Sequence, residues 1–534
     1  LRDHPAEVAE AAGLLQRAAT TRRVWPHAAR SEPLVRAGRA LDAALPTIEG
    51  AALALPDLAD ALGAAEPRRY LVISQNNREL RPSGGFMGTY ARLIIDQGRV
   101  SEFAFGDTYE FEGRGRLIPA PRPVQEYLGY DFVSFRDANW SPDFPTNARL
   151  LREMYGQHRG EAIDGVIAVD VEAMRSLLAA VGPVDVPEFG DTIDADNLVE
   201  RSDQYAFSST AGESRHKELL GAVAEQLIDR LVPPDPDQVP AIARAVWRSL
   251  QDKHILVAVD APGLAAGLAR ANFDGHQAAA DHDYLMVVDA NVGYNKLSTR
   301  VRRELAYNLQ WTGGGGTADL TVTYELAEAP EFRRLHMYTE YRNYVRIYLP
   351  AKVRLSSVDG LVSPPTVERE GDKVVIGGLV RVPPGDRAVI QVKYRYLPGA
   401  SQAGGGYQLL LQKQAGVLAD QVSVRVIDAA GAEVLTWQGE MARDLTLSLA
   451  ERGANRPAAA LLDRTDGILA GFVRWRRGRV AVDNHQGRRY TGQGLMVGKV
   501  GSMGFRRLVG QPDEGGEKEA KPATMTHSML AITG

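Results

Sequence analysis

Cysteine is absent from this chain of 534 residues. Without thiols the protein has no disulfide scaffold, no thiolate metal site and no cysteine nucleophile. The absence fits an extracellular bacterial protein as well as a cytoplasmic one, so it leaves the compartment open.

Long apolar runs and familiar catalytic motifs are also missing. No segment approaches the ~18 consecutive apolar residues of a membrane helix, and the chain contains no convincing P-loop, Rossmann glycine fingerprint, HExxH or GxSxG element. The ten histidines include no pair at metal-ligand spacing, which argues against a histidine-based zinc site. We expect His216, in the first turn of a helix, to be a surface residue.

The chain begins at Leu1, and we expect a signal or membrane anchor upstream of it.

The balance of charge gives the chain no overall basic field. Lysine and arginine total 62 against 67 aspartates and glutamates, a net charge of -5, so we expect no nucleic-acid partner.

The length of the chain suggests roughly three domains, on a prior of ~150 residues for each domain. We predict a helical lead-in or stalk at 1–66, an α/β domain at 67–300, a β-sandwich at 301–452, and an irregular strand-containing segment with a polar tail at 453–534.

Periodicity supports this division. Apolar residues recur at helical spacing before residue 66, and Pro46 and Pro56 are expected to separate short helices. Strands and helices then alternate, which is typical of an α/β layer fold, and Tyr284–Asn295 is expected to complete it as a strand. After Lys296 short strands and turn signals recur, as in a β-sandwich.

Tyr70–Tyr90 is the first candidate site. Tyr70–Ile73 is predicted as a buried strand, followed by a polar loop and a turn through Pro82–Gly85 before a second strand. The amides of Gln75 and Asn77, the guanidinium of Arg81 and the turn's backbone N–H groups suit an anionic ligand. The alternative is a polar loop whose glycines serve only the turn.

The second candidate is the loop Phe135–Pro145, which places a cation, two carboxylates and an amide close together. These side chains are Arg136, Asp137, Asn139 and Asp143. The alternative interpretation is that they satisfy buried backbone groups while Trp140 packs. Thr146 is expected to cap the following helix.

Five motifs resemble a bacterial domain-of-unknown-function family (DUF4012-type) over the span from Tyr70 to about Ala450. Residues 70 to about 232 also resemble, more distantly, the LytR-CpsA-Psr phosphotransferases, which implies a mixed sheet with flanking helices. The motifs are SQNNRELRPSGGFMGTY at 74–90, FRDANWSPDFP at 135–145, DGVIAVDVEAMRSLLAAVGPV at 164–184, YRNYVRIYLP at 341–350 and QKQAG at 412–416.

The resemblance implies an activity outside the bacterial membrane. LytR-CpsA-Psr proteins transfer glycopolymers from polyprenyl-pyrophosphate carriers to peptidoglycan, with arginines on the pyrophosphate and an aspartate-bound Mg²⁺. Matching positions here are Arg81, Asp107, Asn139 and Arg215. The family's arginine before Asp107 is replaced by Gly106, its aspartate after Arg81 by the segment 83–85, and a further helix arginine by Glu213.

Two hypotheses follow. In the first, a cell-envelope phosphotransferase with an incomplete motif set binds a polyprenyl-pyrophosphate-linked glycan through Arg81, Arg136 and Arg215. Asp107 then holds Mg²⁺, with Asp137 or Asp143 as its partner, and an aspartate deprotonates the attacking hydroxyl. In the second, a membrane-anchored cell-surface protein keeps the fold without the activity and serves assembly or adhesion as a homo-oligomer.

Overall fold

Two helices, α1 (Pro5–Val24) and α2 (Glu32–Ala61), precede the first sheet. The computed structural model describes residues 5–24, 32–113, 117–207, 212–232, 234–328, 340–397 and 407–449, all within one compact unit, Leu1–Arg477.

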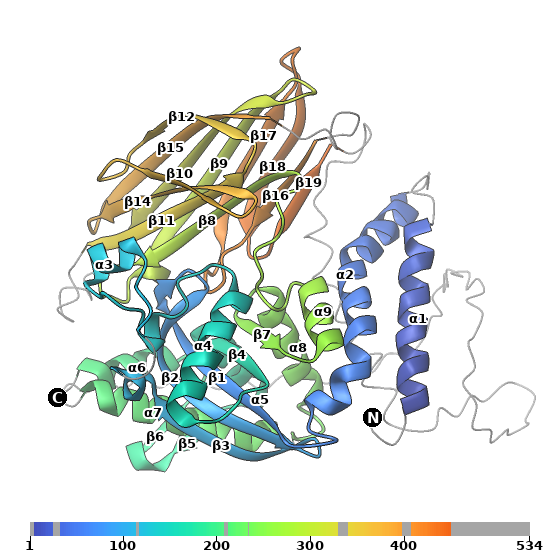
Figure 1. Ribbon diagram of the computed structural model, residues 1–534, viewed down its shortest axis with the longest axis vertical. Coiled ribbons are helices and arrows are strands. Elements are labelled where there is room, and N and C mark those ends of the chain that lie inside the picture. The colour runs from blue at the N-terminus through green and yellow to red at the C-terminus, as the bar shows by residue number, and fades with distance from the viewer. Residues whose placement is uncertain are drawn as a thin grey trace, which may run out of the picture. The chain divides into compact units, whose positions relative to one another are not determined.

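Pro46 and Pro56 lie inside α2 and do not interrupt it, so the expected short helices are one long helix. α2 packs on α9 (Pro262–Arg270) where two glycines meet (Figure 1). A Cβ on Gly50 would lie 2.5 Å from the carbonyl oxygen of Gly267.

The α/β module is built on a five-stranded mixed sheet in the order β3-β2-β1-β4-β7. β1 runs parallel to β4, and the other neighbours are antiparallel. The strands are β1 (Arg68–Arg81), β2 (Gly84–Asp96), β3 (Arg99–Asp107), β4 (Gly165–Asp170) and β7 (Ile255–Val259).

Side-chain alternation along the strands gives the sheet two different faces. Leu71, Ile73 and Val166 belong to a core with α4 (Phe144–Arg159), whereas Val169 packs with α5 (Val171–Val181) and α7 (Gly212–Leu231). The remaining elements are η1 (Thr108–Phe111), α3 (Arg122–Leu128), η2 (Phe135–Asp137), β5 (Val184–Val186), η3 (Pro187–Phe189), β6 (Asp191–Ile193), α6 (Leu198–Phe207) and α8 (Val239–Gln251).

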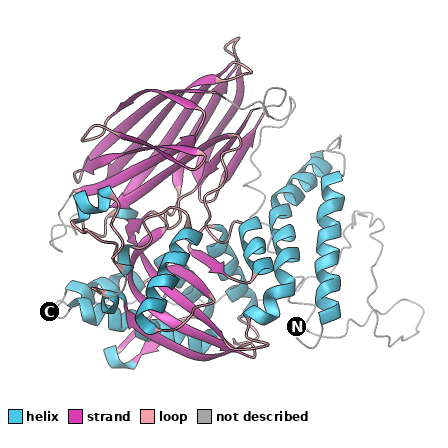
Figure 2. Cartoon of the chain, in the orientation of Figure 1, coloured by secondary structure: helices cyan, strands magenta, loops and turns pink. Residues whose placement is uncertain are grey.

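A β-sandwich of two six-stranded sheets follows the α/β module (Figure 2), which confirms the predicted fold class. The sheet orders are β12-β15-β10-β9-β17-β18 and β13-β14-β11-β8-β16-β19, with a large apolar core between them. The elements are β8 (Asp283–Asn291), η4 (Ser298–Arg300), β9 (Val301–Trp311), β10 (Gly316–Leu326), β11 (Tyr341–Pro350), β12 (Val353–Asp359), β13 (Thr366–Glu370), β14 (Lys373–Val382), β15 (Asp386–Tyr396), β16 (Gln408–Gln412), β17 (Asp420–Ile427), β18 (Glu433–Met441) and β19 (Leu445–Ser448).

Three further local predictions were wrong. The segment Tyr284–Asn295 does not complete the α/β sheet, because β8 pairs with β11 and β16 inside the sandwich. Gln75–Arg81 is the second half of β1 and not a loop; register shifts between Ser74 and Gln75 and between Asn76 and Leu80 absorb its irregular pairing with β2. Asp143, not Thr146, caps α4 by accepting from the Thr146 backbone N–H. The segment predicted at 453–534 lies outside the described residues.

None of the described helices is long and apolar enough to cross a membrane.

Candidate functional site

The glycine pair after β1 is required by close packing. Gly84 has φ +136°, and a Cβ there would lie 1.9 Å from Oε1 of Gln75. A Cβ on Gly85 would lie 2.2 Å from the backbone carbon of Asn76. The turn therefore closes against the bulged end of its own strand, which supports the structural interpretation of the two glycines.

Arg81 and Asp137 form a buried ion pair beside this turn. Nε of Arg81 lies 3.2 Å from Oδ1 of Asp137, and the two side chains are 4% and 3% exposed. Nη1 of Arg81 also donates to the carbonyl of Asn291 in β8, at 2.9 Å, and Ser134 donates to the other carboxylate oxygen of Asp137. Arg81 thereby ties the α/β module to the sandwich.

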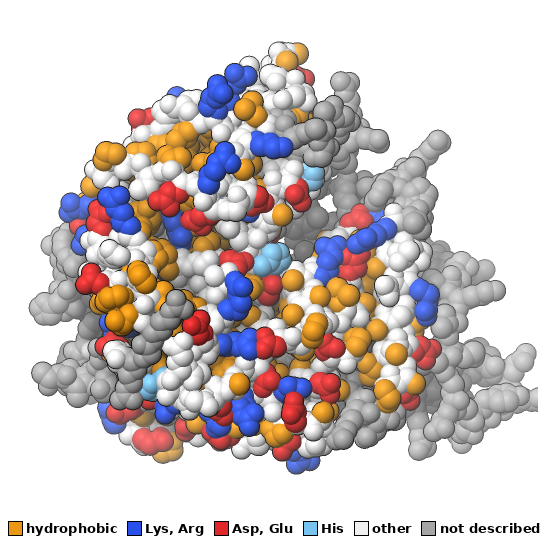
Figure 3. Space-filling model, in the orientation of Figure 1, with side chains coloured by type: hydrophobic (Ala, Val, Ile, Leu, Met, Phe, Trp, Pro, Cys, Tyr) orange, Lys and Arg blue, Asp and Glu red, His pale blue; other side chains and the backbone are white. Residues whose placement is uncertain are grey.

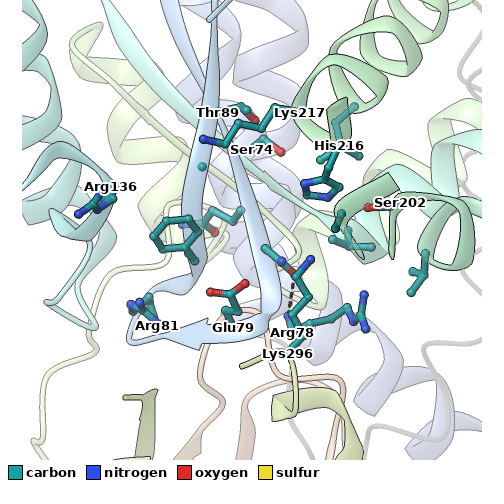
Figure 4. A pocket seen from close by; sticks show the side chains of 18 of the residues that line it. Ser74, Arg78, Glu79, Arg81, Thr89, Arg136, Ser202, His216, Lys217 and Lys296 are labelled. Atoms are coloured by element: carbon teal, nitrogen blue, oxygen red, sulfur yellow. Dashed lines mark hydrogen bonds between the residues drawn. The ribbon is translucent and has the colours of Figure 1, made fainter. Parts of the chain in front are cut away.

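A cavity of about 330 Å³ opens on the α5, α6 and α7 side of β1 (Figure 4). Five cationic side chains line it against two acidic ones, Glu79 and Asp137. The cations come from β1, η2, α7 and the segment before η4, and they are Arg78, Arg81, Arg136, Lys217 and Lys296. In Figure 4 they surround the opening from several sides, with Lys217 and His216 projecting from α7.

Each of the four cations besides Arg81 has a carboxylate partner. Arg78 lies 2.7 Å from Asp203, which also receives Lys296 at 3.6 Å. Lys217 bonds both oxygens of Asp107, at 3.1 and 2.9 Å. Arg136 pairs with Glu112 and lies over the rings of Tyr109 and Tyr130. These partners differ in exposure, with Asp107 at 47% and Glu112 at 42%, but Asp203 at 14%.

The other wall of the cavity is apolar. Its side chains come from α5, α6 and α7, and they are Val171, Met174, Leu198, Val199, Ala206 and Leu220. Several of them also belong to the small core that these helices share. One cavity therefore presents a cationic side and a hydrocarbon side.

His216 reports the electrostatics of this cavity. Its pKa is lowered to about 4, mainly by burial and also by the neighbouring charges of Lys296, Arg78 and Lys217, against the opposing effect of Asp203. The imidazole is therefore neutral at pH 7. Contrary to the prediction of a surface residue, His216 is partly buried and lines the cavity.

The structure brings together only part of the predicted site. Gln75, Arg81, Arg136 and Asp137 line the cavity. Asp107 does not line it but bonds Lys217, which does.

The remaining predicted residues make structural contacts. Asn77 donates to the carbonyl of Gly416, and Asn139, fully buried, donates to that of Gly85. Asp143 caps α4. Arg215 lies over the ring of Phe189 and pairs with Glu218, and it is not among the residues that line the cavity.

The aspartates expected to hold or flank Mg²⁺ have hydrogen-bond partners of their own in the protein. Asp107 bonds Lys217, Asp137 bonds Arg81 and Ser134, and Asp143 accepts from Thr146. Within the described part of the chain, no group of three or more His, Cys, Asp or Glu side chains is placed to hold a metal ion.

The cavity lies largely within a region that matches a protein family. Residues 65–205 match the family described as protein of unknown function (DUF4012). The match confirms the resemblance on which the sequence interpretation rested, and this DUF4012 region includes β1, η2, α5 and most of α6. No curated protein matches the chain.

Solved structures give distant matches. TagV of Bacillus subtilis has 14% identity and a TM-score of 0.26, over 39% of this chain and 81% of its own. The protein gbs0355 of Streptococcus agalactiae has 12% identity and a TM-score of 0.24, over 40% and 77%. An M1 zinc metallopeptidase of Deinococcus radiodurans has 18% identity and a TM-score of 0.16, over 30% and 41%. Scores at this level support no conclusion about activity.

Sequence reasoning did not assign four basic residues of the cavity to the site, namely Arg78, His216, Lys217 and Lys296. Arg78 has a recognisable signal, because Ser74, Asn76 and Arg78 alternate along β1 and all line the cavity. The two α7 residues are followed at helical spacing by Leu220, another lining residue. Lys296 has no comparable signal in the sequence.

The basic character of the site is local. Figure 3 shows basic and acidic side chains interspersed over the face in view, with no broad area of one sign. A net charge of -5 for the chain agrees with this picture. The attraction for an anion that the described residues offer at this site therefore comes from the cavity's own cations.

Proposed function

We propose that the chain binds the phosphate or pyrophosphate group of a lipid-linked glycan, as a protein of the bacterial cell envelope. One observation carries the proposal: a single cavity combines five cationic side chains with an apolar wall from α5, α6 and α7. Such a combination suits an amphiphile with an anionic head, because the head needs charge-assisted hydrogen bonds and the chain needs a dry surface. A free sugar phosphate would leave the apolar wall unused.

The exposure of the partner carboxylates separates ligand-binding cations from structural ones. Glu112 and Asp107 are partly solvated, so a phosphate replaces them on Arg136 and Lys217 at little cost. Asp137 is almost fully buried, and removing it from Arg81 would leave an uncompensated charge. Lys217 is therefore one proposed ligand contact. Arg136 is the other, through the Nη1 that pairs with Glu112, because it is its Nε that faces Asp137, at 3.7 Å. Arg81 holds the floor of the cavity in place.

Binding to farnesyl pyrophosphate, measured by calorimetry, tests the proposal. Lys217→Ala and Arg136→Ala should each weaken binding about tenfold or more, since a hydrogen bond to a charged group contributes about 1.5–3 kcal/mol. Lys393→Ala is a matched control, because Lys393 is half-exposed on the sandwich and 3.8 Å from Asp319. Equal affinity in all four proteins, or no binding by the wild type, would contradict the proposal.

The same calorimetric titration also tests whether binding needs magnesium and whether the lipid chain contributes to affinity. Repeating it with Mg²⁺ and with EDTA shows whether a cation is needed beside the protein's own. Inorganic pyrophosphate should bind more weakly than farnesyl pyrophosphate, because it cannot use the apolar wall. Detection of the native protein in a bacterial envelope fraction tests the proposed location and the anchor.

A second candidate function is surface assembly without turnover. It needs the two modules to stay together, and buried hydrogen bonds join them: Gln414 donates to the carbonyls of Arg81 and Asp289, and Asn77 to that of Gly416. Under this proposal Lys217→Ala leaves self-association unchanged in analytical ultracentrifugation. A monomeric wild-type protein would refute it.

A further inference from the structure

A second cavity, of about 470 Å³, lies between the sandwich and the Phe135–Pro145 loop. One wall comes from β11, β13 and β14. The other comes from Trp140, Ser141, the first turns of α4 and the segment that begins α3. Neither module forms this cavity alone.

Strand register builds the sandwich wall. Thr366, Gly377 and Arg346 are direct neighbours across β13, β14 and β11, and Glu368 and Glu370 follow Thr366 on the same face of β13. Gly377 keeps the space above its strand open. A Cβ there would lie 2.4 Å from the Tyr344 hydroxyl and 2.6 Å from Oγ1 of Thr366.

The polar groups of this wall have unused hydrogen-bonding capacity. Arg346 is 8% exposed and donates to the carbonyl of Trp140 at 2.6 Å. Its Nη1 lies 4.0 Å from Oε1 of Glu370, which is too far for a hydrogen bond. Its buried Nε has no acceptor among the described residues. Glu368 is exposed on an edge strand. A guanidinium and two carboxylates on one wall offer both donors and acceptors.

We propose that this cavity binds a neutral saccharide. Sugar hydroxyls both donate and accept, so they match Arg346 together with Glu368 and Glu370. The carbon faces of a sugar ring match the apolar lining at Val133, Leu150 and Val375. Two arginines, Arg122 and Arg346, stand against three acidic residues in the lining, so the cavity has no strong excess of one charge that would favour an ion. The volume falls in the range of small-ligand sites, about 300–1,000 Å³.

Asp137 lines this cavity and the cationic one. The claim that this saccharide is the glycan carried by the lipid phosphate rests on the proposed function. Saccharide binding itself does not, because it uses residues of β11 and β13 that are absent from the cationic cavity.

Saturation-transfer NMR on the intact protein, with maltotriose and triacetylchitotriose as probes, tests this inference. At least one should bind at millimolar concentration, and Glu368→Ala should weaken it about tenfold. Glu440→Ala is the matched control, because Glu440 is an exposed glutamate on β18, an edge strand of the other sheet. Binding should be unchanged in Glu440→Ala and in Lys217→Ala.

Absence of binding by both saccharides overturns the inference, and so does binding that Glu368→Ala leaves intact. Displacement of the saccharide by a lysine-rich peptide at equal concentration would show a cation site instead. If farnesyl pyrophosphate fails to bind while a saccharide binds through Glu368, the proposed lipid ligand is wrong and this saccharide site remains.

Discussion

The ammonium group of Lys217 lies 2.9 Å from Oδ2 of Asp107, across 110 positions of the chain. It also lies 3.9 Å from the centre of the Tyr109 ring. α7 therefore presents its cation at the end of β3, beside the apolar wall that the same helix supplies. The residue expected to hold a metal is instead the partner of a cation that lines the cavity.

Substituting Asp107 by asparagine separates two roles for this carboxylate. Asparagine keeps the side-chain oxygen that accepts from the Tyr109 backbone N–H, but it releases Lys217 from its ion pair. Farnesyl pyrophosphate should then bind about threefold more tightly, since exposed pairs contribute up to ~1 kcal/mol. Calorimetry without metal measures this. Weaker binding that depends on Mg²⁺ would show that Asp107 is a metal ligand.

The titration of His216 should report ligand binding. Its pKa of about 4 in the free protein follows from burial and neighbouring cations, and a bound phosphate favours the imidazolium and raises the pKa. The imidazole proton signals in NMR, assigned with His216→Gln, measure the shift. An unchanged pKa with saturating farnesyl pyrophosphate would place the ligand elsewhere.

The same histidine makes stability fall in acid. Because its folded pKa is depressed from 6.5 to about 4, the unfolded chain binds more protons in this interval. The free energy of unfolding should therefore fall by about 3 kcal/mol as the pH drops from 6.5 to 4. Urea unfolding of the wild type and His216→Gln across this range measures the difference, and parallel curves would contradict it.

Asp283 in the sandwich core should act in the opposite direction. Full burial raises its pKa to about 6, although the hydroxyls of Tyr307 and Tyr407 donate to it at 2.5 and 2.6 Å. The folded chain then binds more protons between pH 3.8 and 6, so this residue's contribution to stability decreases by about 3 kcal/mol as pH rises through that range. Asp283→Asn should remove this slope in urea unfolding, with Asp319→Asn, on the outer face of β10, as control.

Arg81 and Asp137 should prove structural. Arg81→Ala leaves a buried carboxylate without its partner and should cost about 3–5 kcal/mol of stability. Urea unfolding measures this loss, and Arg149→Ala, an exposed arginine on α4, serves as the control. A fully stable Arg81→Ala protein that no longer binds farnesyl pyrophosphate would show that Arg81 is a ligand contact.

Local pattern was enough for the order of the two modules and for most of their elements. Hydrophobic periodicity reports strand and helix directly, so the alternation of strands and helices in the α/β module and the recurrence of strands in the sandwich were predictable. The exceptions have physical causes. β8 resembles any buried strand, and only its partners β11 and β16 assign it to the sandwich. Gln75–Arg81 resembles a loop because its polar side chains are buried at a junction between modules.

The residues of the candidate site could be predicted only in part. Residue types alone indicated an anion site near Arg81 and Arg136, and both line the cavity. They did not reveal that Arg81 is held by Asp137 and Asn291, or that Asn77 and Asn139 serve backbone carbonyls. Such pairings depend on burial, which short-range pattern does not encode.

The amino-acid sequence by itself determined a cysteine-free α/β module followed by a β-sandwich, because backbone propensity and periodicity act over a few residues. Tertiary structure alone decided which charges meet. Arg78, Lys217 and Lys296 are far apart in the chain, and they line one cavity because β1, α7 and the segment before η4 pack around it. Since electrostatic and apolar contributions act through space, this combination of charged and apolar side chains exists only after folding.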